Sequence, residues 1–313
     1  MSMIERNIYR LFKRDAILEK LAQFAAEGKI AQIAKLLRIR PDLRIEVLFT
    51  LAGLGAQDEM KAILIEHPED LLVSHHLRDI SGAEFSSITL LQHAIWTRDV
   101  RYMANMFLDC LPKNEQGEKI RVALEQQVKE HMAKGVVYQL KGVEHKERHF
   151  NLQPLIIALH TYVENYNHWT EEQRKEHWCT VVGLAQTLIP AHIRHHYCDP
   201  EEAFWNNPNF KKPKLKRSLE VYNWILEKSQ LWSESLAGLG SDFGIYAGLP
   251  LFFCGGGGCT ARAVFDGSPN LAALQALDKT RTEIDLPALI ERLHISIQNM
   301  EDDLDCGNFR AYN

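Results

Sequence analysis

The chain has 313 residues, 46% of them hydrophobic and 25% charged, which is enough to bury a large core. The formal net charge of −5 argues against a dedicated nucleic-acid binder, because such proteins usually carry an excess of basic residues. The sequence offers no apolar run of about 18 to 20 residues for a membrane span, and residues 1–6 do not read as a secretory signal peptide. Six scattered cysteines suit free thiols in a reducing compartment.

Helical periodicity dominates from the start of the chain. Apolar residues recur at steps close to three, four and seven up to Gly28, as on one face of an amphipathic helix. A second short helix is expected at residues 30–37, and Pro41 ends it or opens the next turn. We therefore expect residues 1–43 to form an N-terminal helical cap.

The next part of the chain contains an internal repeat with a period of 43 residues. The two copies share an apolar spacing of three, nine, three and one, at Leu48, Leu51, Met60, Ile63 and Leu64 and again at Leu91, Ala94, Met103, Met106 and Phe107. This spacing predicts a helix, a tight turn at residues 53–58 or 97–99, and a second helix packed antiparallel on the first. Such a hairpin needs stacked neighbours to bury its apolar face.

A polar stretch at residues 74–85, called the finger below, separates the two hairpins and should project as a loop or a hairpin. Residues 89–94 then match the ankyrin signature T-P-L-H-x-A at its threonine, leucine and alanine, and residues 153–158 keep the proline, leucine and alanine. The finger is the natural place for the extra residues of the longer period. These patterns predict an all-α fold of degenerate ankyrin-like helical-hairpin repeats, an α-solenoid with inserted loops, over residues 44–198.

The C-terminal part, residues 199–313, is expected to be a helical region with a Gly-rich loop and an acidic tail. Further helices are expected at residues 115–134, 169–189, 218–235 and 286–300. Thr170 should cap the second of them, with acidic residues in its first turn. The pattern leaves open whether this region continues the repeat array or forms a separate domain.

Six segments carry a family resemblance, at residues 79–85, 91–96, 101–112, 177–179, 190–192 and 239–246. They resemble the ankyrin-like repeat modules of Legionella and Coxiella effector proteins that a type IVB (Dot/Icm) system secretes. The resemblance implies export from the bacterial cytoplasm into a host cell and virulence-related binding to a host protein. The expected location there is the host cytosol, or the nucleus if the basic run described below acts as an import signal. It implies no catalytic residue. The acidic run at residues 301–305 looks like an export signal of such effectors, or is a solvated helix end.

Two groups of histidines have spacings that invite a zinc interpretation. His145 and His149 would share one face of a helix, but Glu147 does not follow the H-E-x-x-H order, so an exposed polar connection is favoured. The densest set of donors is His192, His195, His196 and Cys198, whose spacing matches no standard zinc site. We therefore predict no metal and no other cofactor.

Two other stretches have unusual composition. Cys254 and Cys259 flank four glycines, and either thiol could serve a hydrolase or transglutaminase together with a distant histidine. A tight turn joining two helical units is the favoured interpretation. The basic run at residues 211–217 suits nuclear import, nucleic acid or anionic lipid, although a solvated loop is favoured.

The function expected from these patterns is a protein–protein interaction module, with no catalytic residues and no nucleic-acid partner. Stacked hairpins form a concave surface with loops along one edge, where aromatic and arginine side chains anchor partners. The candidate contacts on that edge are His75, His76, Arg78, Asp79, Trp96, Arg98 and Asp99. The alternative is a cysteine-dependent enzyme that uses Cys254 or Cys259.

Overall fold

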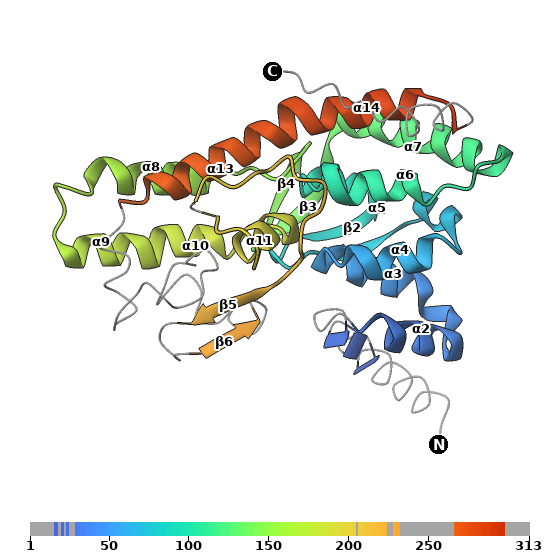
Figure 1. The fold of residues 1–313 in the computed structure, drawn as a ribbon, viewed down its shortest axis with the longest axis horizontal. Helices are drawn as coiled ribbons and strands as arrows, with labels where there is room; N and C mark the ends of the chain where they lie inside the picture. The colour runs from blue at the N-terminus through green and yellow to red at the C-terminus, as the bar shows by residue number, and fades with distance from the viewer. Residues whose placement is uncertain are drawn as a thin grey trace.

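The structure is a computed structural model that describes residues 16–17, 20–21, 23–24, 29–204, 206–223, 228–231 and 266–297. Within these residues, helices pack around a four-stranded antiparallel sheet, and a two-stranded hairpin lies apart from that sheet (Figure 1). The expected all-α solenoid is therefore wrong, and the fold is mixed α/β. The extended backbone of the strands is stabilised by pairing along the sheet, which a helical period in the sequence cannot reveal.

The elements follow one another in two helix-rich halves joined by the sheet. In the element names, η marks a short 3₁₀-helical (η1, η2) or π-helical (η3, η4, η6) segment. The N-terminal half contains α2 (Ile30–Ile39), η1 (Pro41–Leu43), α3 (Arg44–Leu54), α4 (Gln57–Leu64), η2 (Pro68–Leu72), α5 (Leu90–Trp96), η3 (Val100–Ala104), α6 (Asn105–Asp109) and α7 (Glu115–Lys134). The second half contains α8 (Gln153–Asn165), α9 (Glu171–His177), η4 (Trp178–Val182), α10 (Gly183–Gln186), α11 (Ala191–Tyr197), α13 (Ser268–Thr280), η6 (Arg281–Asp285) and α14 (Leu286–His294). The strands are β1 (Ser74–Arg78), β2 (Glu84–Thr89), β3 (Val136–Leu140), β4 (Val143–Glu147), β5 (Glu220–Asn223) and β6 (Lys228–Leu231).

The two helical hairpins of the repeat are present as α3–α4 and as α5 followed by η3 and α6. Helix α3 packs against both α4 and α5, and α4 packs against α6, so the two hairpins stack as the repeat predicts. Gly55 closes the first hairpin with a φ of +67°, and a Cβ there would lie 2.9 Å from Nε2 of His195. The predicted helix at residues 115–134 is confirmed, as is the cap at Thr170, whose side chain accepts from the N–H of Gln173.

The finger is a β-hairpin that contributes two strands to the sheet. The strand order is β1-β2-β3-β4, and the inner strands β2 and β3 meet where Glu84 pairs with Gln139. The helix predicted at residues 218–235 is wrong, because β5 and β6 pair as an antiparallel hairpin there. The β-branched and aromatic residues of the sequence E-V-Y-N favour extended backbone over a helix.

The C-terminal helices α13, η6 and α14 continue one another as a rod across the top of the molecule (Figure 1). The rod packs on α8 near its beginning and on α7 near its end. Its buried leucines belong to the hydrophobic core that also contains the first half of the chain. Ion pairs hold the rod to that half, from Arg98 to Asp278 at 2.5 Å and from Arg101 to Asp285 at 2.9 Å.

Several expectations concern residues that the structure does not describe. The Gly-rich loop and the acidic tail lie outside the described residues, and the boundaries 1–43, 44–198 and 199–313 stay predictions. None of the helices in the described part of the chain combines the length and the hydropathy needed to cross a lipid bilayer.

Candidate functional site

A groove with a volume of about 450 Å³ lies between α3 and β1. One wall is formed by residues of α3 and the other by the finger, at Glu46, Phe49, Thr50, Gly53, Leu54, His75, His76, Leu77, Arg78, Asp79, Ile80, Ser81 and Gly82. Gly53 allows the close approach of the two elements, because a Cβ at this position would meet the carbonyl oxygen of Arg78 at 2.3 Å. The groove therefore combines a buried apolar floor with polar side chains along the finger.

Four of the seven predicted contact residues line this groove. His76 and Arg78 are exposed and His75 is half-buried, with its ring 5.2 Å from that of Phe49. Arg78 lies 3.4 Å from Glu84 in an exposed pair, which leaves the guanidinium available to a partner. Asp79 is buried instead: its Oδ1 accepts from the N–H of Ser81, and its Oδ2 lies 3.1 Å from Nε2 of His93.

The other three predicted contacts lie inside the protein rather than on an exposed edge. Trp96 is 0% exposed, and its ring packs against Phe85, Tyr138 and Phe150. Arg98 and Asp99 are also buried. The repeat correctly located the turn at residues 97–99, but the loop after β4, helix α11, the loop before β5 and the C-terminal rod cover it.

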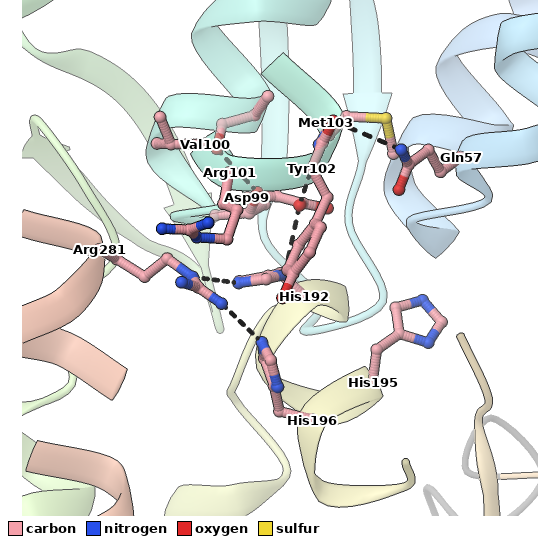
Figure 2. A network of polar contacts seen from close by, with 12 residues as sticks. Gln57, Asp99, Val100, Arg101, Tyr102, Met103, His192, His195, His196 and Arg281 are labelled. Carbon is pink, nitrogen blue, oxygen red and sulfur yellow. Dashed lines mark hydrogen bonds and ion pairs between the residues drawn. The ribbon is translucent and has the colours of Figure 1, made fainter. Parts of the chain in front are cut away.

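A buried polar cluster, called the Asp99–Arg281 cluster below, occupies the space under this turn (Figure 2). The Asp99 carboxylate caps η3 by accepting from the N–H of Met103 at 3.2 Å. Arg217 holds both carboxylate oxygens, with Nη1 2.8 Å from Oδ2 and Nη2 3.1 Å from Oδ1. Burial raises the pKa of Asp99, but the charge and hydrogen bonds of Arg217, together with the hydrogen bond from Met103, bring that pKa below its ordinary value.

Arg281, fully buried on η6, forms the other half of the cluster. Its Nε donates to Nε2 of His192 at 3.0 Å, and its Nη2 donates to Nε2 of His196 at 2.9 Å (Figure 2). Its Nη1 donates to the Asp285 carboxylate at 2.6 Å and to the Phe210 carbonyl at 2.9 Å. Since a guanidinium can only donate, both histidines accept at Nε2 and carry their single proton on Nδ1.

The neutral state of these histidines agrees with their surroundings. Burial, together with the positive charge of Arg281, lowers the pKa of His192 well below its ordinary value. Burial and the neighbouring His192 do the same to His196. In this tautomer, Nδ1 of His192 faces Oδ1 of Asp99 at 3.3 Å, which links the two halves of the cluster.

His195 occupies a different position, beside the turn between α3 and α4. Its Nδ1 lies 2.8 Å from the Ser218 carbonyl oxygen and its Nε2 lies 3.0 Å from that of Leu54. A neutral ring can donate to only one of the two oxygens. Burial and the charge of Arg217 lower the pKa of His195 to about 4, so this ring too is neutral at pH 7.

Acid is expected to destabilise the protein through these three buried histidines. Their folded-state pKa values lie below the ordinary value of 6.5, so the unfolded chain binds more protons as the pH falls. Each can then lower the free energy of unfolding by up to about 1.4 kcal/mol per pH unit, for His195 between pH 6.5 and about 4. Urea unfolding at pH 7.5, 6 and 5 measures this slope. Equal stability at the three pH values would contradict this expectation. The variant His160→Gln is the control: it removes an exposed histidine and should leave the dependence of stability on pH unchanged.

The Asp99–Arg281 cluster has a structural role, and it is called the clasp from here on. Its donors and acceptors hold η3, α11, the loop before β5 and η6 to one another. Within the described residues, no group of three or more histidine, cysteine, aspartate or glutamate side chains is arranged to hold a metal ion. His145 and His149 do not share a helix, because His145 lies on strand β4 and His149 lies in the loop that follows it. The His145 ring stacks on that of Tyr138, and Nη2 of Arg98 donates to Nδ1 of His149.

The described thiols and the basic run also have structural surroundings. Cys110, Cys179 and Cys198 are buried, and burial raises the pKa of Cys110 to about 11. Cys254 and Cys259 lie outside the described residues, so the cysteine-enzyme alternative stays a prediction. In the basic run, Lys212 pairs with Asp199 and Glu202 while Arg217 belongs to the clasp, and Lys211, Lys214 and Lys216 are exposed.

Sequence reasoning missed the role of Arg281 and Asp285 in this clasp. Their spacing of four residues on a helix was the only local signal, and such pairs are common on exposed helix surfaces. The dense set at residues 192–198 suggests metal ligands by its composition. Its actual partner, Arg281, lies more than 80 residues further along the chain.

Comparison with known proteins identifies a family and a relative that this chain resembles. A family described as the CBUA0006 C-terminal domain matches residues 154–293. The uncharacterized protein CBUA0006 of Coxiella burnetii (strain RSA 493 / Nine Mile phase I) is 31% identical over 255 residues, which cover 76% of this chain and 72% of the relative. No solved structure gives a significant match. The chain therefore belongs to the family of CBUA0006.

Proposed function

We propose that the protein binds another protein through the groove between α3 and β1. The observation that carries this proposal is the placement of His75, His76 and Arg78 along one wall of a groove with an apolar floor. Such a surface suits a partner segment whose apolar side chains fill the floor and whose polar groups meet the finger. The hydrogen bond from the Ile80 N–H to the Gly53 carbonyl at 3.1 Å holds the two walls together.

We further propose that the partner is a host protein and that this chain is a secreted bacterial effector. This step is supported by the resemblance of several segments to type IVB effector modules and by the relative from Coxiella burnetii. Under this proposal the protein leaves the bacterial cytoplasm and meets its partner in the host cytosol or nucleus.

Filling the groove is expected to abolish binding without unfolding the protein. Thr50→Arg places a long side chain in the groove from a half-buried position on α3. It should lower the affinity for a partner captured from host lysate by at least about tenfold. Isothermal titration calorimetry measures the affinity once the partner is purified. Thr180→Arg is the matched control, because both threonine hydroxyls donate to the carbonyl four residues earlier at 2.8 Å and Thr180 lies outside the groove. Equal affinity of the two variants would refute the groove as the binding site.

A further inference from the structure

We infer that the edge strand β4 binds an extended peptide of a partner protein by strand addition, with an apolar side chain of that peptide entering the pocket beside the β3–β4 hairpin. The inference rests on the proposed protein-binding function but concerns a second site, away from the groove. It names the form of the recognised segment: an antiparallel strand with an acidic, an apolar and a basic residue in succession.

The backbone of β4 is available for pairing on its outer side. β4 is the last strand of the sheet, and no described helix or strand other than β3 packs closely against it. The two-residue turn at Lys141 and Gly142 has φ values of +51° and +76°, as in a type I′ turn. In such a hairpin Leu140 and Val143 exchange hydrogen bonds, so the alternation points the N–H and C=O groups of Glu144 and Lys146 away from β3.

These outward groups have no partner among the described residues. The hydrogen bonds found in the described part of the chain include none to the backbone of Glu144 or Lys146 outside the β3–β4 ladder. An unpaired strand edge is a template for another strand, and main-chain hydrogen bonds then supply affinity.

A pocket of about 380 Å³ lies on one face of the same hairpin. Its lining is largely apolar and comes from the hairpin, from the start of α8 and from the end of α10, at Tyr138, Leu140, Lys141, Val143, His145, Glu147, Phe150, Asn151, Pro154, Leu155, Ala185, Leu188 and Ile189. The Tyr138 hydroxyl donates to Glu147 at 2.6 Å, and the His145 ring stacks on the Tyr138 ring with centroids 5.1 Å apart, so these three side chains contact one another beside the pocket.

The pocket and the free edge are in register with each other. Side chains alternate along a strand, so Val143, His145 and Glu147 face the pocket while Glu144 and Lys146 face the other way. A strand added to β4 would follow the same alternation, and its residue beside His145 would point toward the pocket. Val143, 58% exposed, leaves an apolar side chain open beside that position.

The charges on the outer face specify the peptide further. Within the sheet Lys146 is opposite Val137 and Glu144 is opposite Gln139, which donates to it at 3.3 Å, so β3 neutralises neither charge. An added antiparallel strand would be attracted by an acidic residue beside Lys146 and a basic residue beside Glu144. Read from its N-terminus, the peptide therefore carries acidic, apolar and basic residues in that order.

Backbone methylation of a synthetic peptide tests the strand geometry. The probe is a fluorescently labelled peptide with the central sequence Val-Glu-Leu-Lys-Val, titrated with the full chain and followed by fluorescence anisotropy. N-methylation of the glutamate or the lysine removes an amide that points at β4 and should weaken binding by about tenfold. N-methylation of the leucine, whose amide points away, should change the affinity by less than about twofold. Equal effects of all three methylations, as for a small apolar ligand in the pocket, or no binding of the parent peptide, would overturn the inference.

A charge reversal tests the register. Lys146→Glu should lower the affinity for the parent peptide by about fivefold. A peptide with lysine in place of its glutamate should bind this variant with the original affinity. Failure of that recovery would overturn the proposed pairing, as would a β4-dependent dimer of the chain, seen by analytical ultracentrifugation, that excludes the peptide. Thr50→Arg should leave peptide affinity unchanged. Loss of peptide binding in the β4 variants with intact partner binding at the groove, or the reverse, separates the two sites.

Discussion

Replacement of Asp99 by alanine should lower the free energy of unfolding by about 3–5 kcal/mol. The substitution leaves the Arg217 guanidinium, whose side chain is only 12% exposed, without its carboxylate; among the described residues, the side-chain oxygen of Gln57 at 2.8 Å is then its remaining hydrogen-bond partner. It also removes the cap of η3 and the acceptor opposite His192. Urea unfolding followed by circular dichroism at pH 7 measures the loss.

A second aspartate provides the matched control for this substitution. Asp109 also pairs with an arginine, Arg292, at 2.5 Å, but its side chain is 52% exposed. Asp109→Ala should therefore cost less than about 1 kcal/mol, because exposed ion pairs contribute little. Similar losses in the two variants would mean that Asp99 does not hold the clasp together.

Replacement of Trp96 by alanine should also lower the free energy of unfolding by about 3–5 kcal/mol, because it removes a large buried side chain from the core. The indole lies with ring centroids 4.9 Å from both Phe85 and Tyr138 and 5.6 Å from Phe150, so its removal opens a cavity between α5, β2 and β3. Trp96→Phe keeps part of the aromatic packing and should lose less. Thermal and urea unfolding of both variants measure the difference.

The outcome for Trp96 bears directly on its interpretation as a partner contact. If Trp96→Ala were as stable as wild type and yet lost its partner, the side chain would act in binding and the packing argument would fail. Ile157→Ala, at a side chain 59% exposed on α8, provides the control for the removal of a large apolar group from the surface. It should change stability by less than about 0.5 kcal/mol.

The sequence predicts the helices of this fold better than its strands, for a physical reason. The spacing shared by Leu48 and Leu91 and their neighbours reflects two helices that each bury one face, a signal carried by local periodicity. β3 shows alternating burial, but β4 reads V-E-H-K-E with its side chains exposed or half-buried. Its extended conformation depends on pairing with β3, and local pattern contains little of that information.

The candidate site divides in the same way. His75, His76 and Arg78 are candidate contacts in the sequence because they lie on one contiguous finger between two recognisable hairpins, and in the structure they line the groove. The clasp was not, because Arg281 meets His192 and His196 across 89 and 85 residues of chain. The histidines form a dense set in the sequence, but only the folded chain shows that Arg281 donates to two of them.

The ion pairs that hold the C-terminal rod also bear on the speed of folding. The hydrogen bond from Arg101 to Asp285 joins residues 184 positions apart, as does that from Arg98 to Thr282. Contacts of such long range make loop closure entropically costly, and proteins rich in them fold slowly. During synthesis the carboxylates that neutralise Arg98 and Arg101 emerge from the ribosome long after the arginines do. The ion pairs of Arg98 and Arg101 with the rod can therefore form only after almost all of the described chain has been synthesised.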